Sequence, residues 1–312
     1  MTNPEIAKPI PASSRPLFPF LILALGLISA TFSVIFMRMA LDTGIASPVI
    51  VAVRMLLAVV IFTPFVLRNH PQTIRGLRKR DWLLLPIAGL MFAADLVLFS
   101  EAVKHTSILI VTVIGGLAPL WTALLERFVL RTPLHRLVYI GLLLAIVGGV
   151  MIALAGSGNS SGMGPNPLLG ITLALGSGAS SACYLTVARS LRPRIPLLPY
   201  IWLIFGIALV VVLLVASGTG AVFTGHAAEG YLWVLMTTIA GQMIAHPAIN
   251  FAVGFISPTF ISISGQSITV MGTILAFFIF QEVPGIGEVL GSIIILLGVI
   301  FAITGQNEFR KS

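Results

Sequence analysis

The 312-residue chain is 57% hydrophobic and only 9% charged, with a mean hydropathy of +1.07. A water-soluble domain carries roughly 25% charged residues, so this composition excludes an ordinary soluble protein. Apolar runs of about 20 residues recur, which is the length that a helix needs to cross ~30 Å of hydrocarbon. A membrane β-barrel would instead show shorter segments of alternating polarity, so a helical bundle is expected.

The sequence predicts an all-α integral membrane protein with ten transmembrane helices. A polar, proline-rich N-terminal tail, residues 1–16, is expected to be disordered, and residues 307–312 form a predicted C-terminal tail. The lone Cys183 lies in an apolar segment and excludes an intrachain disulfide. In chain order the expected spans are residues 18–40, 46–67, 82–103, 107–129, 136–155, 168–189, 198–216, 231–254, 259–280 and 287–304.

The basic residues indicate the orientation of the chain. Fifteen of the 18 Lys and Arg residues fall in the tails and in alternate loops, whereas the loops around 156–167 and 218–230 contain none. Lys and Arg concentrate on the cytoplasmic side of membrane proteins. This distribution predicts an even number of spans with both termini in the cytoplasm, and it explains the net charge of +8 without nucleic-acid binding.

The two halves of the chain resemble each other at an offset of 151 residues. The predicted repeats are residues 17–155 and 168–306, joined by the Gly- and Ser-rich linker 156–167. Because each repeat has five spans, the second enters the membrane from the opposite side, which is the architecture of many secondary transporters. The coinciding pairs are Pro16 and Pro167, Arg38 and Arg189, Pro48 and Pro199, Trp82 and Trp233, Thr122 and Thr273, and Pro133 and Pro284.

These features resemble the EamA-type transporters of the drug/metabolite transporter superfamily. The eighth span, GQMIAHPAINFAVGFISP, is similar to a GHxxxN-type span found in part of that family. The other matching positions are Arg38, Pro48, Arg54, Ala102–Ser107, Pro119 and Gln281–Pro284.

The resemblance implies a secondary carrier of the bacterial inner membrane, without enzymatic activity or a cofactor. Its solute would be a small organic metabolite, such as an amino acid, exported by alternating access around a central cavity. The expected partners are this solute and the lipid bilayer, and the chain would be a monomer or homodimer. Two alternatives remain: a membrane-embedded enzyme acting on a lipid-soluble substrate, and an exchanger resembling nucleotide-sugar transporters. No nucleotide-binding, hydrolase or metal-ligand motif occurs in the sequence.

Polar residues within the spans are candidates for the solute site, because such residues are costly in lipid unless they face other helices or a water-filled cavity. Gln242, His246 and Asn250 are spaced four apart, which places them on one face of an α-helix. The 151-residue offset carries Asp95 onto His246, so these two residues are predicted to flank one central site. Pro247 predicts a kink beside His246.

Arg54 and Asp95 lie at similar predicted depths and are expected to pair or to share a polar network. The pair could be a structural clamp, or Asp95 could exchange a proton as the solute moves. Arg54 and Arg38 are therefore assigned structural or coupling roles. The remaining candidates for solute contacts are Phe99, Trp121, Tyr184 and Gln266.

Overall fold

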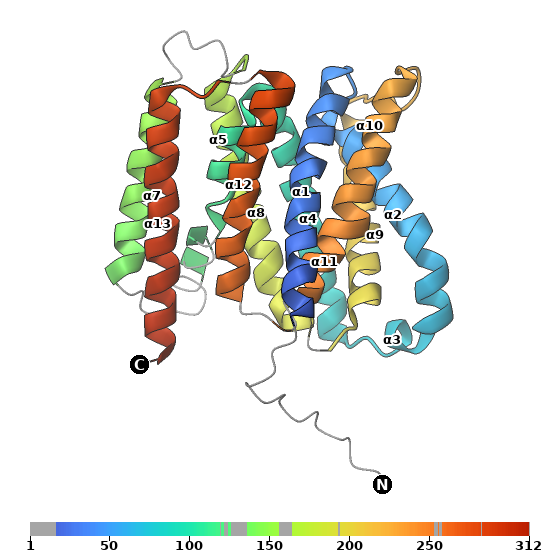
Figure 1. Ribbon diagram of the computed structural model, residues 1–312. Helices are drawn as coiled ribbons and strands as arrows, with labels where there is room; N and C mark the ends of the chain where they lie inside the picture. The colour runs from blue at the N-terminus through green and yellow to red at the C-terminus, as the bar shows by residue number, and fades with distance from the viewer. Residues whose placement is uncertain are drawn as a thin grey trace.

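The computed structural model in Figure 1 describes residues 17–118, 120–121, 124–125, 136–155, 164–192, 194–252, 255, 258–281 and 283–311. All regular elements in these ranges are helices, which confirms the predicted all-helical class. The predicted disordered tail 1–16 and most of the predicted linker, residues 156–163, lie outside the described residues.

Helices occur in each of the ten predicted ranges. Their bounds are α1 (Phe18–Asp42), α2 (Ser47–Asn69), α3 (Pro71–Arg75), α4 (Lys79–His105), α5 (Ile108–Gly115), α7 (Arg136–Ala155), α8 (Pro167–Leu191), α9 (Leu197–Gly218), α10 (Ala228–Thr238), the π-helix η1 (Ile239–Ala245), α11 (His246–Ala252), α12 (Pro258–Phe280) and α13 (Ile286–Lys311). Residues 307–311 of the predicted C-terminal tail are helical and continue α13. No proline follows Pro284 to interrupt that helix.

Within the described residues, six helical segments are long and apolar enough to cross a membrane by length and composition. Shorter apolar stretches occur at Tyr139–Gly149, Val270–Phe280 and Val289–Gly298. The chain is therefore a multi-pass membrane protein, and the count of ten spans stays a prediction. The six long segments are Phe18–Asp42, Ser47–Asn69, Lys79–His105, Pro167–Ala188, Leu197–Gly218 and Ala228–Ala252.

Local sequence signals explain where several helices begin. Prolines occupy the first turns of α1, α2 and α8, where a missing backbone N–H leaves no intrahelical hydrogen bond unmade. The Ser107 hydroxyl accepts a hydrogen bond from the Ile110 N–H at the start of α5. The Asn166 side chain caps α8 in the same way, by accepting from the Leu169 N–H.

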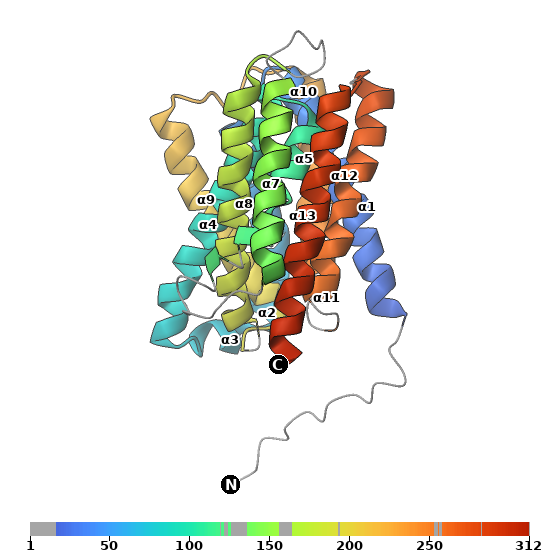
Figure 2. The ribbon, with the colours of Figure 1, turned by 90° about the vertical axis from the view of Figure 1, so that its left-hand side faces the viewer.

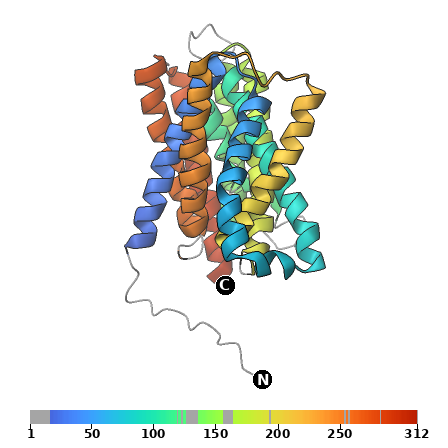
Figure 3. The same ribbon diagram turned by 90° about the vertical axis from the view of Figure 1, so that its right-hand side faces the viewer.

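The two halves of the chain pack with matching partners. In the first half, α1 contacts α11 and α12 of the second half, and in the second half α8 contacts α4 and α5 of the first. Helices in equivalent positions also pair with each other: α2 with α9, α5 with α12, and α7 with α13. Figure 3 shows α10 and α11, in orange, passing between the blue α1 and α2. Exchanging the halves therefore preserves the packing scheme.

The equivalent helices α1 and α8 run in opposite directions. Arg38, near the end of α1, donates hydrogen bonds to the carbonyl oxygens of Val103 and Thr106 at the end of α4. The backbone N–H of Asn166, at the start of α8, donates to the carbonyl oxygen of His105 at the same end. One end of the bundle thus holds the C-terminus of α1 and the N-terminus of α8 (Figure 1).

An ion pair joins the halves at the opposite end of the bundle. Asp81, in the first turn of α4, is only 3% exposed. One carboxylate oxygen accepts from the Arg78 backbone N–H and caps α4, and the other lies 2.9 Å from the Arg194 guanidinium. Because Arg194 follows α8, this contact connects the beginning of α4 to the second half of the chain.

Glycine residues bring α7 and α13 into close contact; the two helices form one edge of the molecule in Figure 1 and lie side by side in Figure 2. A methyl group at Gly148 would lie 2.5 Å from the carbonyl oxygen of Gly291, and one at Gly298 would lie 2.7 Å from that of Gly141. Small residues of this kind let two membrane helices pack with their backbones in contact.

We expect Gly148→Ala to separate α7 from α13 and to destabilise the detergent-solubilised protein by about 1–3 kcal/mol, as overpacking usually does. The neighbouring Gly149→Ala is a matched control, because a methyl group there meets no atom within 4 Å. Thermal unfolding of the two purified variants measures the difference. Equal unfolding temperatures for the two variants would contradict the close packing.

Candidate functional site

A cavity of about 360 Å³ lies between the two halves of the bundle. From the first half it is lined by residues of α1, α2, α4 and α5, and from the second half by residues of α8, η1, α11 and α12. Most of its wall is apolar. The polar and ionisable side chains that reach it are Ser33, Arg54, Asp95, Ser100, Thr112, Ser177, Ser181 and His246.

Asp95 connects the first half to the second across the cavity wall. It lies in the middle of α4, and its carboxylate accepts a hydrogen bond of 2.6 Å from the Ser177 hydroxyl of α8. Ser181, one turn further along α8, lines the same cavity. Ser177 is 2% exposed, so this hydrogen bond is shielded from solvent on the serine side.

Arg54 makes a second connection between the halves. Its side chain extends from α2, and its Nε donates a 2.8 Å hydrogen bond to Oε1 of Gln242 in η1. One terminal nitrogen lies 3.8 Å from the Met37 sulfur, which also accepts a hydrogen bond from Ser100. The other terminal nitrogen lies against Gly241, where a methyl group would approach it to 2.8 Å.

The segment around His246 contains a π-helix rather than a simple proline kink. Residues Ile239–Ala245 form η1, and the His246 N–H donates to the carbonyl oxygen of Gly241, five residues earlier. Such π-helical turns occur frequently at functional sites. The His246 ring packs edge-on against Phe92 and Phe205, with centroid distances of 5.0 and 6.3 Å, and it lines the cavity.

The structure brings four of the predicted site residues to one cavity. Asp95 and Phe99 of α4, Arg54 of α2 and His246 of α11 all line it. Asp95 and His246, which the repeat offset relates to each other, therefore lie on the wall of the same space.

Other predicted contacts lie behind this wall. Gln242 is fully buried against Arg54, and Asn250 donates a hydrogen bond to the backbone oxygen of His246. The predicted polar face holds for His246 and Asn250, which keep the spacing of four within α11, but not for Gln242, because the extra residue in the π-helical turn displaces it relative to His246.

The remaining predicted site residues either lie away from the cavity wall or have side chains outside the described residues. Tyr184 packs on Phe92 with a centroid distance of 5.1 Å, and Trp121 lies beside Gly178 in the packed interior. Arg38 joins the ends of α1 and α4. The side chain of Gln266 on α12 lies outside the described residues.

Arg54 and Asp95 were expected to pair or to share a polar network, and the ion pairs among the described residues do not include this pair. Arg54 is bonded to Gln242 and Asp95 to Ser177, so each charge has a neutral partner from the other half of the chain. The two residues were expected to interact because their predicted depths in the membrane are similar. Depth alone does not give the direction in which each side chain leaves α2 or α4, so it did not predict their partners.

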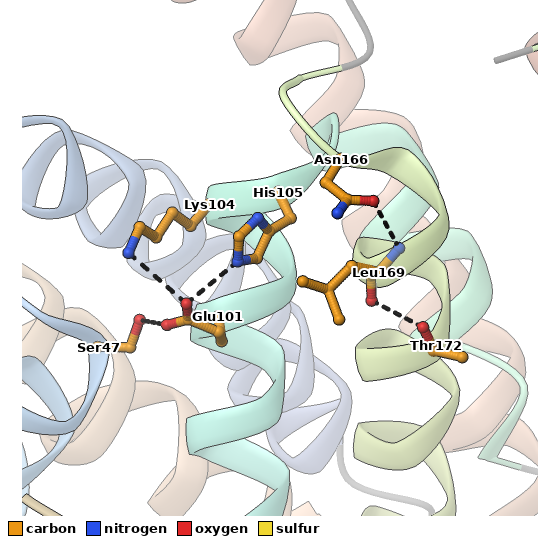
Figure 4. Close-up of polar contacts among 7 residues, drawn as sticks. All are labelled: Ser47, Glu101, Lys104, His105, Asn166, Leu169 and Thr172. Carbon is orange, nitrogen blue, oxygen red and sulfur yellow. Dashed lines mark hydrogen bonds and ion pairs between the residues drawn. The ribbon is translucent and has the colours of Figure 1, made fainter. Parts of the chain in front are cut away.

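A polar cluster that sequence reasoning missed closes one end of the bundle (Figure 4). The Glu101 carboxylate accepts a hydrogen bond from Ser47 at the start of α2 and interacts with Lys104 and His105 at the end of α4. The spacings of three and four residues place Lys104 and His105 near Glu101 on one helix. The beginning of α8, with Asn166, lies beside this cluster.

Comparisons with known proteins agree with this architecture. One solved crystal structure, whose description states no function, matches with a TM-score of 0.61 at 16% sequence identity, over 93% of this chain and 98% of its own, which shows a shared fold. No curated protein matches the chain. The model of the EamA-like transporter family matches twice, over residues 17–154 and 168–304. The chain therefore belongs to the EamA-like transporter family, within the drug/metabolite transporter superfamily.

Proposed function

We propose that this membrane transporter moves a small organic metabolite, such as an amino acid or a related compound, by alternating access around the central cavity. The observation that carries the proposal is the cavity itself, whose walls come from both halves of the chain. Its volume of about 360 Å³ is at the lower end of the ~300–1,000 Å³ typical of pockets for small ligands.

The proposed topology is ten spans in two inverted five-helix repeats, 17–155 and 168–306. The opposite directions of α1 and α8 and the matching contacts of the two halves support it. The positive-inside distribution supports a location in the inner membrane with both termini in the cytoplasm. In this orientation the Glu101 cluster lies at the outer end of the bundle and the Asp81–Arg194 pair at the inner end.

Reconstitution into liposomes tests the proposed function. Proteoliposomes loaded with an unlabelled amino acid should accumulate the labelled form from outside, as a carrier does by counterflow. Empty liposomes and liposomes loaded with an unrelated solute provide the controls. Formation of a chemical product without movement of solute would favour a membrane-embedded enzyme instead. The direction of transport, proposed as export, is measured separately with an imposed outward gradient.

A further inference from the structure

Arg54 is a buried cation at the cavity wall that has no counter-ion among the described residues. Its side chain is 4% exposed, and it lines the cavity. None of the ion pairs among the described residues includes it. A buried charge is costly unless it is paired and hydrogen-bonded. Within the part of the chain that the structure describes, the guanidinium therefore has hydrogen-bond partners but no carboxylate partner.

The contacts of Arg54 fix its position and leave its charge uncompensated. Gln242 holds Nε through a neutral amide oxygen, and the Met37 sulfur is a weak acceptor for one terminal nitrogen. The absence of a side chain at Gly241 makes room for the other terminal nitrogen, since a methyl group would lie 2.8 Å from it. η1 thus presents the guanidinium at the cavity wall.

The charges of the cavity wall limit the solute that would satisfy Arg54. Among the described residues of the wall, Arg54 is the only Lys or Arg. A single positive charge matches a singly charged anionic group of the solute better than a phosphate dianion. Asp95, on the same wall, carries the opposite charge and is bonded to the neutral Ser177. A solute with one carboxylate and one ammonium group would provide each of the two charges with a partner.

We propose that Arg54 is the anion-binding residue of the cavity and binds the carboxylate of the transported solute, while Gln242 and Gly241 position it. The guanidinium offers parallel N–H groups that match the two oxygens of a carboxylate. This inference rests on the proposed function and adds to it the chemical group that the site recognises. It also replaces the structural role predicted for Arg54 by a binding role.

Matched acid and amide probes test the assignment. L-Leucine with L-leucinamide and L-phenylalanine with L-phenylalaninamide differ in the carboxylate alone, and each is assayed by counterflow and by thermal shift of the purified protein. We expect the wild-type protein to exchange at least one acid and to discriminate against its amide by about tenfold or more, as the loss of a charged hydrogen bond implies.

Gln242→Glu is the decisive variant. The new carboxylate has almost the same shape as the glutamine amide and would pair with Arg54, so it should compete with the solute while preserving or raising the unfolding temperature. We expect the apparent affinity for the acid to fall by about tenfold or more. Gln72→Glu, at an exposed position of α3, introduces the same charge away from the cavity and is the control. If Arg54 had a purely structural role, Gln242→Glu would not weaken binding of the acid while preserving or raising the unfolding temperature.

Arg54→Lys provides a second variant should Gln242→Glu fail to fold, because it keeps the positive charge. It should retain the preference for the acid with weaker binding, whereas Arg54→Gln should lose the preference. Two results would overturn the assignment of Arg54: equal exchange of acid and amide by the wild-type protein, or an unchanged preference for the acid in Gln242→Glu. Neither result would contradict the proposed transport function. Exchange of none of the probes would instead contradict the proposed amino-acid transport, and this inference with it.

Discussion

Oxidation of a variant carrying Thr43→Cys and Gly230→Cys should stop transport, and reduction should restore it. Thr43 follows α1 in the first repeat, and Gly230 lies in the first turn of α10 in the second. A Cβ atom at position 230 would lie 3.3 Å from the Thr43 Cβ, slightly closer than the ~3.5–4.5 Å found in disulfides. The bond would tie the two repeats together at the end of the bundle that holds the Glu101 cluster.

The experiment compares one protein in two redox states. Cys183→Ser in the background removes the only native cysteine. Counterflow is measured after mild oxidation and again after dithiothreitol, and the two single-cysteine variants are treated alike as controls. Because alternating access requires each end of the bundle to open in turn, the oxidised protein should show background counterflow. Full activity in the oxidised, cross-linked protein would show that the repeats do not separate at this end.

Asp95→Asn should reduce transport by at least about tenfold and remove its pH dependence. The amide can still accept the hydrogen bond from Ser177, so the contact between α4 and α8 is kept while the negative charge is lost. A charged hydrogen bond contributes roughly 1.5–3 kcal/mol, and each 1.4 kcal/mol corresponds to a factor of ten. Loss of proton exchange would add to this effect if Asp95 carries the coupling proton.

Counterflow rates measured between pH 5 and 8 check this prediction, together with the unfolding temperature of the purified variant. Ser177→Ala is the complementary change, because it removes the hydrogen bond and keeps the carboxylate. It should lower stability and leave the pH dependence of transport in place. An Asp95→Asn protein with the wild-type rate and pH profile would rule out a proton role and favour the structural alternative.

The sequence predicted the helical class, the family and the location of most helices, because these depend on the apolar runs and prolines. It also related Asp95 to His246, and the structure places both on one cavity. A repeat offset is informative here since related positions in two similar halves meet around the same centre. The polar tails were less predictable: without a proline or an apolar pattern, residues 307–311 could be either tail or helix.

The partners of the buried polar residues were not predictable from spacing. Arg54 and Asp95 were expected to pair or to share a polar network, and Gln242 was expected to face the solute. Instead, Gln242 accepts a hydrogen bond from Arg54, and Ser177 donates one to Asp95. The first error arises because depth in the membrane does not give the direction of a side chain on its helix, and the second arises from assuming a regular α-helix around Gln242. The π-helical turn before Pro247 shifts Gln242 relative to His246, and sequence periodicity contains no direct signal for that extra residue.

The π-helix also makes the two halves unequal. Its counterpart in the first half, α4, is α-helical from Lys79 to His105, with Asp95 in an unbroken helix. In the proposed mechanism, in which two inverted repeats alternate around one cavity, the outward-facing and inward-facing states would be related by an exchange of conformation between the repeats. With a π-helical turn in only one of them, this exchange does not return an equivalent molecule, so the two states differ in free energy. The empty transporter should therefore rest predominantly in one orientation, even between two identical solutions.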